Sequence, residues 1–215
     1  MTASSSVATE METKDATGVS SRELLTQATL EELAASERGP SGVSLRAIAR
    51  RAGLSHNAAT HHFGDRSGLL TAVAVVGFSR LEDRLREAGA AGRTAGEDPL
   101  RGLGEAYVAF GLAEPNLLEL MFRADLLRRD DPELQAAQQQ TFAALEEVMG
   151  GGRRPAGTPE DLAMVAWAFV HGLVGLARYG ALSQPGTSPD GEEVRHRAAH
   201  VLNSFGALVQ MDRSR

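Results

Sequence analysis

The stretch SLRAIARRAGLSHNAATHHF, residues 44–63, decides the fold, because it predicts two short helices joined by a tight turn. Apolar residues recur from Leu45 at i, i+3, i+4 and i+7, the pattern of a helix packed on one face. Ser44 stands where an N-cap is expected, and Gly53 stands where a left-handed residue can end the helix. Ser55 caps a second helix after a turn of about three residues. The segment therefore predicts a helix-turn-helix unit.

The second helix of this unit presents polar side chains on one face. The residues that share the outward face are His56, Asn57, Thr60 and His61. Ala59 and Phe63 turn toward the core. The outward face offers hydrogen-bond donors and acceptors, and it has no carboxylate to repel a phosphate. Because a helix-turn-helix unit lays its second helix in the DNA major groove, this helix is a candidate for reading base edges.

The composition agrees with a cytoplasmic protein. The chain has 215 residues, enough for a full hydrophobic core, and it has no cysteine for disulfides or thiolate chemistry. Residues 1–19 are rich in Ser, Thr and Ala and lack the apolar segment of a signal peptide. We expect these residues to form a disordered tail.

The net charge of −6 is unevenly distributed along the chain. Arginines exceed acidic residues around the helix-turn-helix, and acidic residues exceed arginines after residue 86. This division would hold the negative part of the protein away from phosphates. Arg46, Arg50 and Arg51 of the first helix either contact phosphates or form a solvated helix face, and charge alone leaves both interpretations open.

The rest of the chain predicts further helices and few strands, so the expected fold class is all-α. Asp65 or Ser67 opens a long helix, and Gly- and Ala-rich residues 89–96 predict a linker. The expected division is a three-helix DNA-binding domain over residues 20–80 and a helical domain over residues 97–212. Helices in the second domain are expected at 99–113, 116–127 and 132–149, and residues 150–155 favour a plain loop over a phosphate cradle.

The last two helices carry apolar residues at 4-3-4-3 spacing. The residues expected to form a seam are Leu162, Phe169, Leu173, Leu176, Val194, Val201, Phe205 and Leu208. Such a seam closes a bundle either within one chain or between two copies related by a two-fold axis, and we expect a homodimer. The apolar run from 162 to 177 is shorter than the roughly twenty residues that span a bilayer, so we expect a buried helix and no membrane partner.

Three segments resemble the tetracycline-repressor (TetR) family of bacterial regulators. RELLTQATLEELAASERG (22–39) and VSLRAIARRAGLSHNAATHHFGDRSGLLTAVA (43–74) resemble the amino-terminal domain, and WAFVHG (167–172) resembles the WHG motif of one carboxy-terminal type. The resemblance implies an all-helical dimer that binds an operator with its small domain and a small effector with its larger one. Thr60 stands where the family usually has a tyrosine, and His61 could supply the lost contacts.

The resemblance also implies roles for individual residues. Those on positions that usually meet the DNA backbone are Ser44, His61, His62 and Arg66, and those on positions that usually meet base edges are His56, Asn57 and Thr60. We add Arg46 and Ser55 as candidate DNA contacts. The candidate effector pocket comprises Tyr107, Phe110, Met121, Phe122, Trp167 and His171, although apolar residues at helical spacing also pack cores.

The sequence offers no strong sign of other chemistry. His56, His61 and His62 have the wrong spacing for metal ligands on one helix face, and no catalytic set or nucleotide fingerprint stands out. We therefore expect no metal, no cofactor and no enzymatic activity. The expected function is a repressor that a small, mostly apolar effector releases from double-stranded operator DNA. The alternative is a helical ligand-binding or adaptor protein whose helix-turn-helix serves packing alone.

Overall fold

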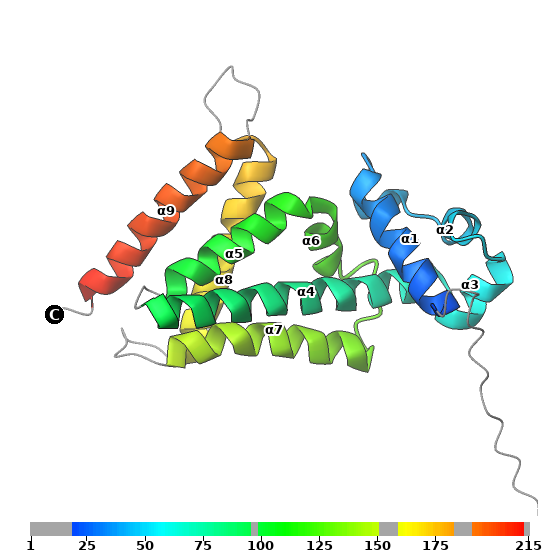
Figure 1. The fold of residues 1–215 in the computed structure, drawn as a ribbon, viewed down its shortest axis with the longest axis horizontal. Helices are drawn as coiled ribbons and strands as arrows, with labels where there is room; N and C mark the ends of the chain where they lie inside the picture. The colour runs from blue at the N-terminus through cyan, green and yellow to red at the C-terminus, as the bar shows by residue number, and fades with distance from the viewer. Residues whose placement is uncertain (1–18, 96–98, 151–158, 183–190, 213–215) are drawn as a thin grey trace, which may run out of the picture.

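The computed structural model describes residues 19–95, 99–150, 159–182 and 191–212, and the described chain is all-α, as predicted. At one end of the molecule lie α1 (Ser21–Ala35), the 3₁₀ helix η1 (Gly39–Gly42), α2 (Leu45–Arg51) and α3 (His56–Phe63) (Figure 1). The long α4 (Arg66–Ala95) runs from this end through the whole body. Around it are α5 (Pro99–Ala113), α6 (Pro115–Met121), α7 (Pro132–Gly150), α8 (Pro159–Arg178) and α9 (Gly191–Asp212).

The N-terminal helices begin and end at the residues that their sequence designates. The Ser20 hydroxyl accepts from the Glu23 amide at 3.2 Å, and the Glu23 carboxylate accepts from the Ser20 amide at 2.9 Å, which completes a capping box for α1. Gly53 has φ +70°, a left-handed conformation that favours glycine. The Ser55 hydroxyl accepts from the Ala58 amide at 3.1 Å and caps α3. The predicted helix-turn-helix is confirmed.

The predicted linker at 89–96 is wrong, because α4 continues through residue 95. Gly89 and Gly92 are buried in this helix. On the neighbouring α5, a Cβ added at Gly102 would lie 3.4 Å from the Ala88 carbonyl oxygen. The small residues therefore let two helices approach closely, and they do not mark a flexible boundary. As a result, α4 belongs to both domains and joins them rigidly.

The helix predicted at 116–127 is also shorter than expected. α6 ends at Met121, and residues 122–131 form a series of turns before α7. Arg123 pairs with Asp125 two residues later at 2.7 Å, a contact that a helix could not make, because residues i and i+2 do not face each other there. The Asp131 carboxylate then accepts from two amides at the start of α7 at 3.0 Å each.

The main core lies between α4, α5, α7 and α8. Its largest fully buried side chains include Tyr107, Phe78, Phe110 and Leu103. By length and composition alone, α8 could cross a membrane, but its inner face packs on α5 and α7. The prediction of a buried helix is right for that inner face only, because Met164 and Val165 are more than half exposed on the other side. The segment 150–155 falls almost wholly outside the described residues.

Candidate functional site

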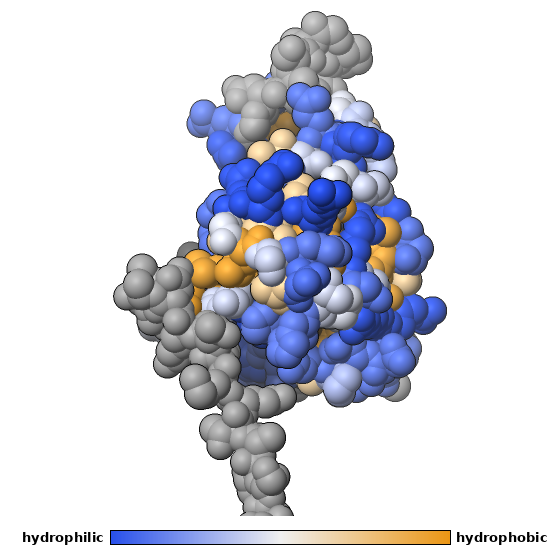
Figure 2. All heavy atoms as spheres, turned by 90° about the vertical axis from the view of Figure 1, so that its right-hand side faces the viewer, coloured by the Kyte–Doolittle hydropathy of each residue, from blue (hydrophilic) through white to orange (hydrophobic). Residues whose placement is uncertain are grey.

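The outward face of α3 carries the polar side chains that the sequence places there. The exposed members are His56, Asn57, Thr60 and His61. The Thr60 hydroxyl donates to the His56 carbonyl at 3.0 Å, so its oxygen can still accept a hydrogen bond. Ala59 and Phe63 are buried beneath, with 0% and 4% of their surface exposed. Figure 2 shows that this end of the molecule is mainly hydrophilic.

Two arginines of α2, the helix packed against α3, have no acidic partner among the described residues. Arg46 and Arg50 are exposed, and within the described residues no ion pair joins either of them to a carboxylate. Arg51 differs, because it pairs with Glu31 and Glu32 of α1 at 3.5 and 3.1 Å. Arg51 therefore has acidic partners within the protein, whereas Arg46 and Arg50 have none among the described residues.

Ser44 is the N-cap residue of α2, and the side chain of Arg66, the first residue of α4, reaches the loop before α2. Ser44 is exposed and makes no capping hydrogen bond. Arg66 donates from Nε to the Val43 carbonyl and from Nη2 to the Pro40 carbonyl, each at 2.7 Å. These bonds fix the loop that leads into α2, a role that the sequence did not reveal. A phosphate contact by Arg66 would have to use its remaining N–H groups.

The C-terminal end of α3 is held by two further arginines. Arg22 of α1 donates to the His62 carbonyl at 3.3 Å, and its guanidinium carbon lies 4.9 Å from the centre of the Phe63 ring. Arg128, from the loop after α6, donates to the Phe63 carbonyl at 3.1 Å and pairs with Asp65 at 3.0 Å. The last carbonyls of a helix lack partners within the helix, so cations stabilise this end. His62 lines a hollow at this junction.

A second contact ties the larger domain to α1. The Asn116 side-chain amide of α6 donates to the carbonyls of Leu33 and Ser36 at the end of α1, each at 2.8 Å. Sequence reasoning missed both Asn116 and Arg128, because their partners lie far away along the chain and no local pattern pairs them. Together these residues fix the position of the N-terminal helices on the body.

Four of the residues predicted to bind an effector come together in the larger domain: Tyr107, Phe122, Trp167 and His171. The Phe122 ring centre lies 4.6 Å from that of His171 and 5.7 Å from that of Trp167, in edge-to-face arrangements. Met121 is buried next to Phe122 in the chain. Phe110 is fully buried, and the Arg84 guanidinium carbon lies 5.1 Å from the centre of its ring, a contact outside this cluster.

A hydrogen-bond chain runs through this aromatic cluster. Trp167 Nε1 donates to the Tyr107 hydroxyl oxygen at 3.2 Å, and that hydroxyl lies 2.9 Å from His171 Nδ1. Burial lowers the pKa of His171 and raises that of Tyr107, so both are neutral near pH 7. The buried Tyr107 hydroxyl needs an acceptor, and we infer that it donates to His171 Nδ1 and leaves the imidazole proton on Nε2.

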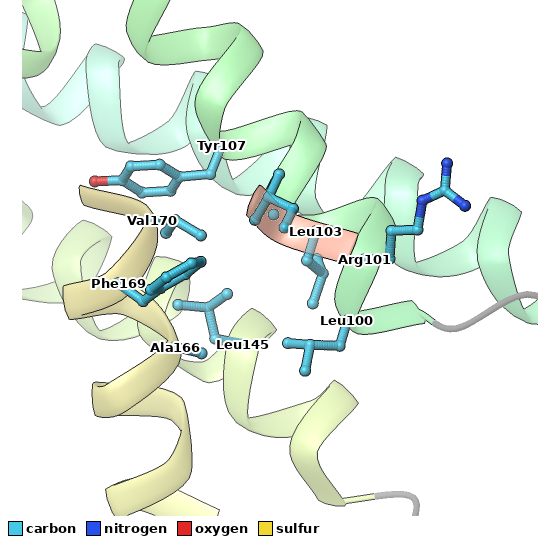
Figure 3. Close-up of a pocket in the computed structure, with 10 residues that line it drawn as sticks. Leu100, Arg101, Leu103, Tyr107, Leu145, Ala166, Phe169 and Val170 are labelled. Carbon is cyan, nitrogen blue, oxygen red and sulfur yellow. The ribbon is translucent and has the colours of Figure 1, made fainter. Parts of the chain in front are cut away.

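The larger domain has two hollows near this cluster. The first, of about 20 Å³, is apolar, and its Arg101 guanidinium points away from the enclosed space (Figure 3). That volume suffices for about one water molecule. The second, of about 330 Å³, is bordered by Phe122 and by residues of the loop after α6. Only the second has the volume that small-molecule sites usually have.

Comparisons with known proteins agree with this architecture. The family model described as bacterial regulatory proteins, tetR family, matches residues 25–73, and the tetracyclin repressor-like C-terminal domain matches residues 100–202. The chain belongs to the tetracycline-repressor family. On that ground it is a transcriptional regulator with a helix-turn-helix domain. No curated protein matches this TetR-family chain.

Solved structures share the fold of this TetR-family chain over nearly its full length. A protein of unknown function from Rhodococcus sp. RHA1 is 28% identical, with a TM-score of 0.73, and the match covers 92% of this chain and 99% of that one. A TetR-family transcriptional regulator from Pectobacterium atrosepticum is 21% identical, with a TM-score of 0.61 and coverage of 87% and 91%. A TetR-family regulator from Marinobacter aquaeolei VT8 is 22% identical, with a TM-score of 0.57 and coverage of 85% and 94%.

The seam predicted on the last two helices of this TetR-family chain needs correction. Leu173 and Val194 are each 4% exposed, so they pack inside the protomer and cannot meet a second copy. Phe169 and Val201 also pack partly against the protomer core, and the Leu162 side chain is half-buried. Helices packed within one chain and between chains have the same spacing, so most of the predicted seam marks faces of α8 and α9 that pack inside the protomer. The side chains of Phe205 and Leu208 lie outside the described residues.

The outer face of α8 is apolar and exposed. Its large members are Met164, Val165 and Leu176, and the exposed Tyr179 follows directly after the helix; Leu176 is the one that the predicted seam contains. Between them lies Gly172, where an added Cβ would meet no atom of the protomer within 4 Å. Among the described residues, no group of three or more histidines and acids is placed to hold a metal ion.

Proposed function

We propose that this TetR-family regulator is a homodimeric repressor that binds a two-fold symmetric operator and leaves it when a small effector binds the larger domain. The observation that carries the proposal is the exposed polar face of α3, which has no acidic residue, together with two arginines of the neighbouring α2 that have no acidic partner among the described residues. Such a face can donate to and accept from base edges while the arginines neutralise phosphates. A cytoplasmic location follows from this proposal.

Individual residues take different parts in the proposed DNA complex. Asn57 can make a paired donor and acceptor contact with adenine, the usual choice of an amide side chain in the major groove. Thr60 has used its hydroxyl proton within the helix, so it can accept from a base amino group or place its methyl group against that of thymine. Arg46, Arg50 and Ser44 are exposed near the start and side of α2 and suit phosphate contacts.

The outer face of α8 supports the homodimer. An exposed, contiguous apolar surface is unfavourable in water and commonly marks a contact with another protein surface. Gly172 leaves space for the close approach of a second helix there. A two-fold axis through this face would also give two copies of α3, as half-sites one helical turn apart require.

DNA binding by matched variants tests the proposal. The purified protein should bind the DNA upstream of its own gene, with an affinity that falls steeply as salt is raised. Arg50→Gln should weaken binding to all sequences alike and reduce the salt slope by about one unit. Arg101→Gln, an exposed arginine at the opposite end of the molecule, serves as the control and should leave both quantities unchanged. Salt-independent or absent DNA binding would contradict the proposal.

A further inference from the structure

The loop between α6 and α7, residues 122–131, borders the larger hollow and also holds the end of the recognition helix. Phe122, Leu127 and Arg129 of this loop line the hollow of about 330 Å³. Arg128, between two of these residues, reaches the C-terminal end of α3. Neighbouring residues of one short segment therefore contact both the hollow and the end of the recognition helix, the two places that the proposed function must connect.

The hollow has an apolar floor and a polar rim. Leu127, Leu134 and Met121 are at most 8% exposed and form the floor, and Phe122, which is 37% exposed, presents its ring there. The Phe122 ring also packs on the aromatic cluster, with its centre 5.7 Å from the Trp167 ring centre. A ligand on this floor would therefore lie within reach of the only tryptophan in the chain.

The rim of the hollow has one cation and no carboxylate. Arg129 is exposed, and within the described chain its guanidinium makes no hydrogen bond or ion pair. Gln138 borders the same space with its side-chain amide. The nearby loop acids Asp125 and Asp131 are engaged elsewhere, by Arg123 and by the first amides of α7 respectively. An unpaired arginine above an apolar floor favours a ligand that has an apolar body and a carboxylate.

The other side of the loop is anchored tightly to the DNA-binding domain. The Arg128 amide donates to the Thr71 hydroxyl at 2.9 Å, and the Ser67 hydroxyl donates to the Leu126 carbonyl at 2.9 Å. The Arg128 guanidinium fits against the backbone near Gly64, where an added Cβ would lie 2.9 Å from Nη2. Because this fit is close, a shift of the loop by a small distance would break the contact with the Phe63 carbonyl.

We propose that the larger hollow binds an amphipathic carboxylate through Arg129, and that its occupation moves the 122–131 loop and withdraws Arg128 from the end of α3. This inference rests on the proposed function, since it names the effector class and the residue that transmits its effect. The carboxylate pairs with Arg129, and the apolar body lies against Phe122. Arg128 is a positioning residue: it acts on DNA through the last turn of α3.

The ligand half of this proposal is tested with 4-phenylbutyrate and its neutral analogue 4-phenyl-1-butanol. Trp167 emission and calorimetry measure binding to the full chain. The carboxylate should bind about ten- to a hundredfold more tightly than the alcohol, the usual gain from a charged hydrogen bond. Arg129→Gln should remove this preference, and Arg101→Gln, at the rim of the apolar hollow, should keep it. Equal affinities for the two compounds, or a preference that survives in Arg129→Gln, would overturn the ligand assignment.

The coupling half is tested by hydrogen exchange of the amides at residues 60–64, a measurement that needs no DNA. Saturating 4-phenylbutyrate should accelerate exchange there in the wild-type protein by about 5- to 150-fold, the usual range of allosteric coupling. Arg128→Gln should exchange rapidly without ligand, respond no further to it, and bind it more tightly than the wild type by up to the same factor, because the contact with α3 no longer has to be broken. Arg129→Gln should have wild-type exchange and no response.

Unchanged exchange in the ligand-bound wild-type protein, or a full response in Arg128→Gln, would overturn the coupling. Arg128→Lys is the control for general loss of folding, because it keeps a cation next to Asp65. Circular dichroism would detect such a loss in either variant. Failure of the proposed function would give a different result. A chain that does not bind DNA can still bind the carboxylate and show both exchange responses. The two failures are therefore distinguishable.

Discussion

Leu176→Asp should convert the proposed dimer to a folded monomer. Leu176 is 51% exposed on the outer face of α8, about three helical turns along from Met164 and Val165, which are 54% and 56% exposed. In the protomer the new carboxylate can therefore remain hydrated, and the fold should persist. In a dimer that buries this face, the same carboxylate would lose its water without gaining a cation.

The size of the effect follows from these exposures. Burial of a whole leucine side chain contributes about 1.5–3 kcal/mol, so a second copy that covers the exposed half contributes about 1 kcal/mol at Leu176. An unpaired buried charge costs several kcal/mol more, and two-fold symmetry repeats the substitution in both chains. The expected loss is at least about 5 kcal/mol per dimer, which raises the dissociation constant more than about a thousandfold.

Sedimentation velocity over a range of protein concentrations measures this dissociation constant. Gln139→Asp, on an exposed position of α7, introduces the same charge away from the outer face of α8 and should sediment like the wild type. Circular dichroism should show unchanged helix content for both variants. If Leu176→Asp retains the wild-type dissociation constant, the outer face of α8 does not form the dimer.

Further predictions address the other parts of the account. Asn57→Ala should cost about 1–3 kcal/mol at one base position and flatten the preference there, as binding to a set of single-base operator variants would show. Gly64→Ala should lower Tm more than Gly53→Ala: both glycines have positive φ, +76° and +70°, but only at Gly64 would the added Cβ meet another residue, Arg128. Equal losses would mean that Arg128 does not fit closely there. Burial lowers the pKa of His171 in the folded protein below its value in the unfolded chain. The neutral imidazole therefore contributes stability at pH values above the unfolded pKa, and this stability is lost as the pH falls through the folded pKa. Urea unfolding at pH 7 and pH 5 should show less of this loss in His171→Gln.

Local patterns predicted the local structure well. The cap at Ser55 and the left-handed Gly53 each depend on residues within a few positions, so the sequence contains their full explanation. The exposed face of α3 follows from the same helical periodicity. These elements are also the ones that identify the family.

Errors arose where one pattern has two physical causes. The Gly- and Ala-rich residues 89–96 indicated a linker, but small residues also suit a packed helix: Gly89 and Gly92 are buried within α4, and Gly102 of α5 lies close to Ala88. The apolar spacing that includes Leu173 and Val194 marked a packed face without stating whether the partner is in the same chain. Composition and periodicity contain no information that separates these cases.

Contacts between distant segments could not be predicted at all. Arg128 and Phe63 are 65 positions apart, and Asn116 and Leu33 are 83 positions apart. Each pair meets only because α4 and α6 place the two domains together. Arg66 is an intermediate case. The resemblance assigned it to the DNA backbone, but the fold gives its guanidinium two carbonyls of the loop before α2.

The most direct measurement is to select fragments of the protein's own genome with the purified chain and to sequence those that bind. The account predicts enrichment of a palindromic site whose half-sites are about one helical turn apart, and it predicts a changed preference at one position of each half-site for Asn57→Ala. Fragments without a shared palindrome, or an identical set selected by Asn57→Ala, would contradict the claim that the outward face of α3 reads DNA.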